Sequence, residues 1–200
     1  MGSRSGVGDG AGVREVPGAP GALTLPIDRS WDGAAVPGGT GLVAALTATP
    51  EAMVVVAEGP VHAAALAPDA PPGTRVDRLW TFDVVECFFR ASDGRYLELE
   101  LGVAGHYLAL RFSGPRELDD ALAQPPIECR LEVREGRWRH EARVPRHWFP
   151  EPIDAIAAFA IEAGRHYAAD PVGGAVPDFH RTHAYRAARI PSWESSRAQR

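Results

Sequence analysis

One stretch of the chain, residues 79–112, constrains the fold more than any other. It reads LWTFDVVECFFRASDGRYLELELGVAGHYLALRF, which is three strand-like runs separated by two short turns that contain glycine. Apolar and polar side chains alternate along much of the stretch, as expected for antiparallel strands with one face on a core. The stretch therefore predicts three consecutive antiparallel strands in one sheet.

The first turn sets how the first two runs pair. A two-residue loop at Asp93-Gly94 would bury charge, because it places Glu86 opposite Leu101. A three-residue loop at 92–94, with Gly94 in the left-handed region, pairs apolar residues with each other, so we prefer it. The apolar pairs in this register are Val85 with Leu101, Cys87 with Leu99, and Phe89 with Leu97.

The second turn, Gly102–Gly105, is interpreted as a four-residue loop. In that register Glu100 faces Tyr107, and Tyr96 faces Arg111. One face of the sheet then gathers aromatic and charged side chains. Its predicted members are Trp80, Glu86, Tyr96, Glu98, Glu100, Tyr107 and Arg111.

This face also carries Phe82, Val84 and Phe88, which are too apolar for open solvent. We therefore expect loops or a second layer to cover part of it, with a fully solvated face as the alternative. The polar members suit a sugar, because a flat aromatic ring packs on the C–H face of a pyranose and charged groups bind its hydroxyls.

The rest of the chain adds more short strands. With 21 glycines and 18 prolines, turns are frequent and long helices are disfavoured. Residues 153–163 are ambiguous, since a short helix and a buried strand fit this apolar run equally well. The pattern predicts an all-β fold, an antiparallel β-sandwich of jelly-roll type with roughly nine to eleven strands. The further strand candidates are 22–27, 42–49, 52–58, 127–134, 137–144 and 184–190.

The composition is that of one globular domain. We expect a Gly-rich disordered tail at 1–21, the folded domain at 22–191 and a frayed tail at 192–200. The net charge of −5 gives no reason to expect nucleic acid or a membrane surface as a partner. The first residues lack the apolar segment of a secretory signal and no run reaches membrane-spanning length, so we expect a soluble, cytoplasmic protein.

Several chemistries are excluded by what the chain lacks. All 21 lysine-plus-arginine positions are arginine, which rules out a Schiff-base lysine and a Walker-type phosphate loop. No GxSxG, HExxH or dinucleotide-binding motif occurs, so we expect a protein that is not an enzyme and needs no cofactor. Cys87 and Cys129 lie in strand-like runs and are interpreted as core thiols, with a single disulfide as the alternative.

Four segments carry a family resemblance: WTFDVVECF at 80–88, YLELEL at 96–101, GHYLALRF at 105–112 and PDFH at 177–180. In this order and spacing they are similar to the DOMON-like superfamily, specifically its family 9 carbohydrate-binding-module branch. The resemblance spans about residues 22–190. It implies a β-sandwich that holds the end of a saccharide between aromatic side chains.

The resemblance also implies roles for individual residues. Trp80 would be the stacking platform, Glu86 an acceptor for a sugar hydroxyl, and Arg111 a nearby donor. Tyr167 is the nearest candidate for a second aromatic. Related DOMON domains bind haem, which requires an axial His or Met ligand, and Met53 is the one internal methionine.

The hypothesis is non-catalytic binding of a carbohydrate or a similar polar small molecule. One alternative is a structural or protein-interaction module in which the polar face is a satisfied buried network. Another is a metal-dependent enzyme that uses Asp178, His180 and His183, whose D-x-H-x-x-H spacing suits zinc or iron. A hydrolase that uses two carboxylates is also conceivable. The candidate ligand-binding residues are Trp80, Glu86, Glu98, Glu100, Tyr107, Arg111, Tyr167, Asp178 and His180.

Overall fold

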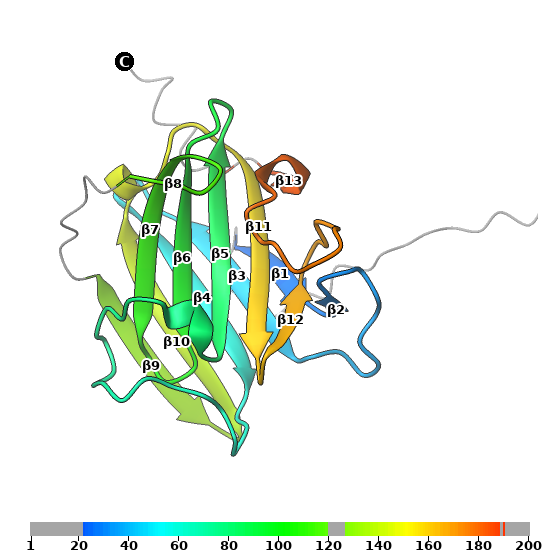
Figure 1. Ribbon diagram of the computed structural model, residues 1–200. Helices are drawn as coiled ribbons and strands as arrows, with labels where there is room; N and C mark the ends of the chain where they lie inside the picture. The colour runs from blue at the N-terminus through cyan, green and yellow to red at the C-terminus, as the bar shows by residue number, and fades with distance from the viewer. Residues whose placement is uncertain (1–21, 120–126, 189, 191–200) are drawn as a thin grey trace, which may run out of the picture.

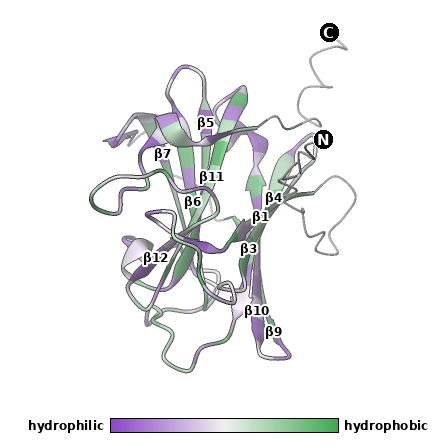
Figure 2. Ribbon diagram, turned by 90° about the vertical axis from the view of Figure 1, so that its right-hand side faces the viewer, coloured by the Kyte–Doolittle hydropathy of each residue, from purple (hydrophilic) through white to green (hydrophobic). Residues whose placement is uncertain are grey.

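Two antiparallel sheets pack face to face in the computed structural model, which describes residues 22–119, 127–188 and 190 (Figures 1 and 2). The predicted all-β sandwich is confirmed. The described residues contain no helix long and apolar enough to span a membrane. The tails expected to be disordered, 1–21 and 192–200, lie outside the described residues.

The smaller sheet has five strands in the order β1-β3-β4-β10-β9. All of its neighbours are antiparallel. Its strands correspond closely to runs expected from the sequence, including the hairpin closed at residues 135–136. The strands are β1 (Leu23–Ile27), β3 (Leu42–Ala48), β4 (Ala52–Pro60), β9 (Glu128–Arg134) and β10 (Arg137–Pro145).

The larger sheet has eight strands, seven in the order β2-β12-β11-β5-β6-β7-β8 and β13 paired with β11. Three of them are only two residues long, which accounts for the excess over the expected strand number. The strands are β2 (Arg29–Ser30), β5 (Val84–Ala91), β6 (Tyr96–Gly102), β7 (Tyr107–Gly114), β8 (Glu117–Leu118), β11 (Ile153–Glu162), β12 (Arg165–Ala168) and β13 (Arg186–Ala187). Three 3-10 turns complete the described elements: η1 (Leu79–Thr81), η2 (Arg146–Trp148) and η3 (Thr182–Ala184).

Residues 153–163 contain a strand and no helix, which resolves the ambiguity left by the sequence. β11 pairs with β5 on one side and with β12 on the other. Most of its residues are buried on both faces, so the alternation of a half-buried strand is absent. A small-residue run such as IDAIAAFAIE has no periodicity that separates the two structures.

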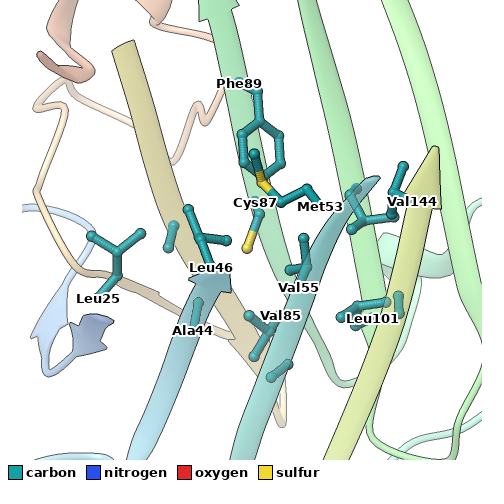
Figure 3. Packing of buried hydrophobic residues seen from close by; sticks show 14 of the residues in the cluster. Leu25, Ala44, Leu46, Met53, Val55, Val85, Cys87, Phe89, Leu101 and Val144 are labelled. Carbon is teal, nitrogen blue, oxygen red and sulfur yellow. The ribbon is translucent and has the colours of Figure 1, made fainter. Parts of the chain in front are cut away.

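The main core fills the space between the sheets (Figure 3). Val85, Cys87 and Phe89 of β5 belong to the same buried cluster as Met53 of β4 and Val144 of β10. The three β5 residues are the apolar side chains that point inward, as the alternating sequence pattern predicted. Both cysteines are free, Cys87 buried and Cys129 half-buried, so no disulfide contributes to stability.

The β5–β6 hairpin has the predicted register. Gly94 has φ of +92°, and its N–H donates to the carbonyl oxygen of Ala91 at 3.1 Å. The three apolar pairs occur as expected, and Glu86 lies opposite Glu100. The three-residue loop was therefore the correct choice.

The predicted register of the β6–β7 hairpin is wrong by one residue. Gly105 has φ of +88° and closes a three-residue loop, in which the Gly102 N–H donates to the His106 carbonyl oxygen at 2.8 Å. Tyr96 consequently pairs with Phe112, and Glu100 pairs with Leu108. Because strand side chains alternate, this shift moves every β7 side chain to the face opposite the expected one.

Two long segments cover the outer face of the larger sheet, as the apolar residues on that face predicted. Residues 61–83 cross one end, and the segment after β12, orange in Figure 1, runs beside β11. Asp83 anchors the first segment, because its carboxylate accepts hydrogen bonds from the backbone N–H groups of Ala163 at 2.8 Å and Leu66 at 3.2 Å. Phe179 anchors the second by stacking on Phe159 of β11, with ring centroids 4.2 Å apart.

Candidate functional site

A pocket of about 430 Å³ opens on the outer face of the larger sheet. Strands β5 and β6 supply Glu86 and Glu98, and β7 and β11 supply apolar side chains. Three segments form its sides: the η1 turn, the β7–β8 turn and residues 177–180. The pocket therefore exists only because segments distant in sequence meet over one sheet.

Two of its lining residues are buried glutamates. Glu86 and Glu98 are each 3% exposed, and Glu100, next to them on the same face, is fully buried. Glu86 Oε1, Glu98 Oε2 and both Glu100 oxygens are buried and have no hydrogen-bond partner among the described residues. A buried charge without a partner is costly, so protons must compensate.

Burial raises the pKa of all three carboxyl groups, and their mutual repulsion adds to the rise for Glu86 and Glu100. The pKa of Glu98 reaches about 7, and those of Glu86 and Glu100 lie well above the usual 4.5. Near neutral pH the floor of the pocket therefore carries less negative charge than three ordinary glutamates would.

Trp80 stands at the pocket and is 40% exposed, which is unusual for so large an aromatic ring. It lies in η1, whose neighbour Leu79 is fully buried and holds the turn against the sheet. Arg78 precedes the turn with φ of +60°, and its carbonyl oxygen accepts a hydrogen bond from Thr81 Oγ1 at 2.9 Å. An exposed ring on an anchored turn can offer its face to a ligand without reorganising the fold.

Tyr96 connects the two segments on the other side of the pocket. Its hydroxyl oxygen accepts a hydrogen bond from the Arg116 backbone N–H at 3.1 Å and lies 2.8 Å from His180 Nδ1. The Arg116 guanidinium donates to Asp178 Oδ1 at 2.7 Å, and the same oxygen accepts the His180 backbone N–H at 3.0 Å. These contacts fix residues 178–180 and the β7–β8 turn to each other and to β6.

The protonation of His180 follows from its surroundings. Burial, and then the positive charge of Arg116, lower the pKa of His180 to about 4, whereas burial raises the pKa of Tyr96 to about 12. At neutral pH the Tyr96 hydroxyl therefore donates to Nδ1 of an uncharged ring. The proton of that ring is on Nε2, which lies 3.9 Å from Glu98 Oε2, too far for a direct hydrogen bond.

The pocket brings together five of the predicted ligand-binding residues: Trp80, Glu86, Glu98, Asp178 and His180. Glu100 lies on the same face as the two lining glutamates but does not line the pocket.

Three other predicted site residues, Tyr107, Arg111 and Tyr167, lie away from the pocket. Tyr107 and Tyr167 belong to the core between the sheets, where the Tyr107 hydroxyl accepts the Ile127 N–H at 3.3 Å. Arg111 is 3.8 Å from Asp119. For Tyr107 and Arg111 the cause is the shifted β6–β7 register. For Tyr167 it is the alternation along β12, which turns His166 to the pocket instead.

The metal-site alternative is not supported. His183 is exposed, while Asp178 and His180 are engaged by Arg116 and Tyr96. Among the described residues no group of three His, Cys, Asp or Glu side chains is placed to hold a metal ion. Met53, the candidate haem ligand, is fully buried between the sheets.

Sequence reasoning missed several pocket residues, among them Phe112, Arg116 and Phe179. Phe112 stacks on Tyr96 with centroids 4.4 Å apart, and Gly105 was the signal that could have placed it on this face. Phe179 is within the PDFH segment. Arg116 lies in a turn at φ of +62°, and no local pattern marks it.

Comparisons with known proteins give both a family and a fold. No family model matches the chain. A Danio rerio protein, UPF0462 protein C4orf33 homolog, is 35% identical over 126 residues, which is 58% of this chain and 63% of that protein. The human protein UPF0462 protein C4orf33 is 33% identical over 125 residues, 57% of this chain and 62% of that protein. This chain thus spans somewhat less than two thirds of the length of these two relatives.

Among solved structures, a Bacteroides uniformis protein provisionally described as carbohydrate-binding aligns with a TM-score of 0.64 at 16% identity. The alignment covers 82% of this chain and 84% of that one. A family 9 carbohydrate-binding module from Caldicellulosiruptor kristjanssonii in complex with glucose aligns with a TM-score of 0.45 at 17% identity, over 72% and 73% of the two chains. The first alignment shows a shared fold, as the sequence resemblance predicted. The TM-score of the second alignment is too low to add to that finding.

A mouse relative, UPF0462 protein C4orf33 homolog from Mus musculus, is 30% identical over 130 residues, 60% of this chain and 67% of that protein. Identity at this level over two thirds of a protein indicates common descent and a common fold. The chain belongs to the UPF0462 (C4orf33) family.

Proposed function

We propose that the pocket on the outer face binds a carbohydrate or a similar polar small molecule without catalysing a reaction on it. One observation carries the proposal: the exposed ring of Trp80 borders a pocket lined by Glu86 and Glu98, which have buried oxygens that no described residue satisfies. A ligand with an apolar face and several hydrogen-bonding groups would complement both features. The fold shared with a protein described as carbohydrate-binding adds support.

A purely structural role for this face accounts less well for the same residues. Such a role requires a buried polar network whose members satisfy one another. Here four carboxylate oxygens remain without a partner among the described residues. Trp80 also stays open to solvent, although covering it would bury more apolar surface.

Trp80→Ala is expected to lower the affinity for a bound saccharide by at least about tenfold, because the stacking surface is lost. Isothermal titration calorimetry against a panel of mono- and oligosaccharides would measure this, after a thermal-shift screen has found the ligand. Trp80→Phe should retain part of the affinity. Val133→Ala, on the smaller sheet and 59% exposed, is the control for loss of an exposed apolar side chain. Unchanged affinity in Trp80→Ala would place the ligand elsewhere.

Glu86→Leu is expected to weaken the same binding by about 1–3 kcal/mol, because a ligand hydroxyl would then face an apolar side chain of similar size. Stability should not fall, since a buried polar group without a partner is removed. Calorimetric titration and a thermal melt on the same sample separate the two effects. If affinity and stability fell together, Glu86 would be a structural residue.

A further inference from the structure

The outer face of the larger sheet holds more acid than base. Glu86, Glu98 and Glu100 lie together on β5 and β6, and the chain has no lysine. Arg116, a lining cation, is already paired with Asp178 at 2.7 Å. Arg90, on the same face, donates to the Thr182 carbonyl oxygen at 2.9 Å and lies 3.4 Å from Asp154. No described residue therefore brings an uncommitted positive charge to the three glutamates.

Two of these glutamates line the pocket, and each has an oxygen that lacks a hydrogen-bond donor. Glu86 and Glu98 line the pocket, are each 3% exposed, and have an oxygen without a hydrogen-bond partner among the described residues. The near ring nitrogen of His180 is 3.9 Å from Glu98 Oε2 and leaves it unsatisfied. An N–H-bearing cation would supply both the missing donors and the missing charge.

Aromatic rings surround the same space. Trp80, Phe112 and Phe179 all line the pocket. The faces of aromatic rings carry partial negative charge and attract ammonium groups, most strongly when water is excluded. Carboxyl groups below and rings at the sides form the environment that suits a protonated amine better than a neutral hydroxyl.

Taking the proposed binding function as its premise, we propose that the ligand carries a protonated amine, as an amino sugar does, and that its ammonium group binds between Glu86 and Glu98 beside Trp80. The sugar ring of such a ligand would use the Trp80 face, and its ammonium would use the carboxylates. This narrows the ligand class from polar molecules in general to cationic ones.

Binding of a cation should release protons, because the raised pKa values of Glu86 and Glu98 leave these groups partly protonated near pH 7, and they ionise against the ammonium. Several further groups face them and set the size of this release. They are Arg90 on β5, Tyr96 and Glu100 on β6, Arg116 in the β7–β8 turn, His166 on β12, and Asp178, His180 and Tyr185 in the segment that follows.

The test is calorimetric titration with three probes: glucosamine, glucose and N-acetylglucosamine. At pH 7 glucosamine should bind at least about tenfold more tightly than either neutral sugar, the difference expected between charged and neutral hydrogen bonds. Its advantage should shrink by up to about tenfold per pH unit towards pH 5, where the carboxyl groups hold their protons. Titration in buffers of different ionisation enthalpy should show proton release with glucosamine and none with glucose.

Matched variants test the placement of the ammonium. Glu86→Gln and Glu98→Gln keep the shape and hydrogen-bonding capacity but cannot ionise, so each should reduce glucosamine affinity about tenfold and leave glucose affinity nearly unchanged. Glu132→Gln, on β9 of the smaller sheet, is the control and should change neither.

The possible failures are distinguishable. Neutral sugars that bind as tightly as glucosamine would overturn the amine inference and leave the proposed function standing. A glucosamine preference that survives both substitutions would overturn the placement between Glu86 and Glu98. A wild-type protein that binds none of the three probes would count against the inference and the proposed function together.

Discussion

Phe159→Ala is expected to lower the free energy of unfolding by about 3–5 kcal/mol, the range for removing a fully buried phenylalanine. Phe159 is fully buried on β11 and stacks on Phe179 at 4.2 Å. It also meets Phe88 edge-on at 5.5 Å. The cavity left by alanine would border the pocket, where the segment 177–180 depends on the stack for its position. Chemical denaturation monitored by circular dichroism would measure the loss.

Two further variants interpret that result. Phe159→Leu keeps most of the volume and loses the ring stack, so it should cost less, about 1–1.5 kcal/mol. Trp80→Ala removes an exposed aromatic from the same face and should change stability by less than about 0.5 kcal/mol. If Phe159→Ala cost no more than Trp80→Ala, the segment after β12 would not be packed on β11 as described.

Thermal stability of the ligand-free protein is expected to fall between pH 6.5 and pH 8. Glu98 has a folded pKa of about 7 against 4.5 when unfolded, and burial raises the pKa values of Glu86 and Glu100 well above 4.5. In this window the folded state binds more protons than the unfolded chain. The stability that these protons confer is complete below pH 4.5 and is lost as the pH rises through the folded pKa values.

The chosen window isolates the glutamates. His140 and His180 have pKa values of about 4 in the folded state, against 6.5 in the unfolded chain. Their contribution to stability therefore rises with pH, opposite to that of the glutamates, but it changes mainly between about pH 4 and 6.5. Each glutamate that stays protonated contributes a loss of about 1.4 kcal/mol per pH unit, or about 2 kcal/mol across the window. For a domain of this size, that predicts a Tm decrease of about 5 °C or more.

Differential scanning fluorimetry across this pH range measures the effect, and Glu100→Gln provides the control. The glutamine side chain cannot ionise, so the slope should become shallower by about one glutamate's contribution. Glu132→Gln, half-exposed on the smaller sheet, should leave the slope as it is. A Tm that stays level or rises from pH 6.5 to 8 in the wild type would mean that the three carboxyl groups are solvated or paired with cations.

The sequence was sufficient to predict those features of the fold that depend on residues close together in the chain. Alternation along β5 and β6, with Gly94 closing the turn, determined which residues pair and placed Glu86, Glu98 and Glu100 on one face. The reason is energetic, because a register shifted by one residue buries carboxylates among leucines. The same local argument missed the β6–β7 register, because a turn with a glycine at each end allows loops of different length and a one-residue change reverses the faces.

What the pocket is made of was decided by contacts across the chain. Tyr96 meets His180 from 84 positions away, and Arg116 meets Asp178 from 62 positions away. Such pairs carry no periodic signal, since the side chains that face each other are chosen by the path of the covering segments and not by strand alternation. The sequence alone therefore determined the sheet face and its acids. Only tertiary structure decided that Trp80 stays open, that Tyr107, Arg111 and Tyr167 leave the site, and that Glu86 and Glu98 line a pocket.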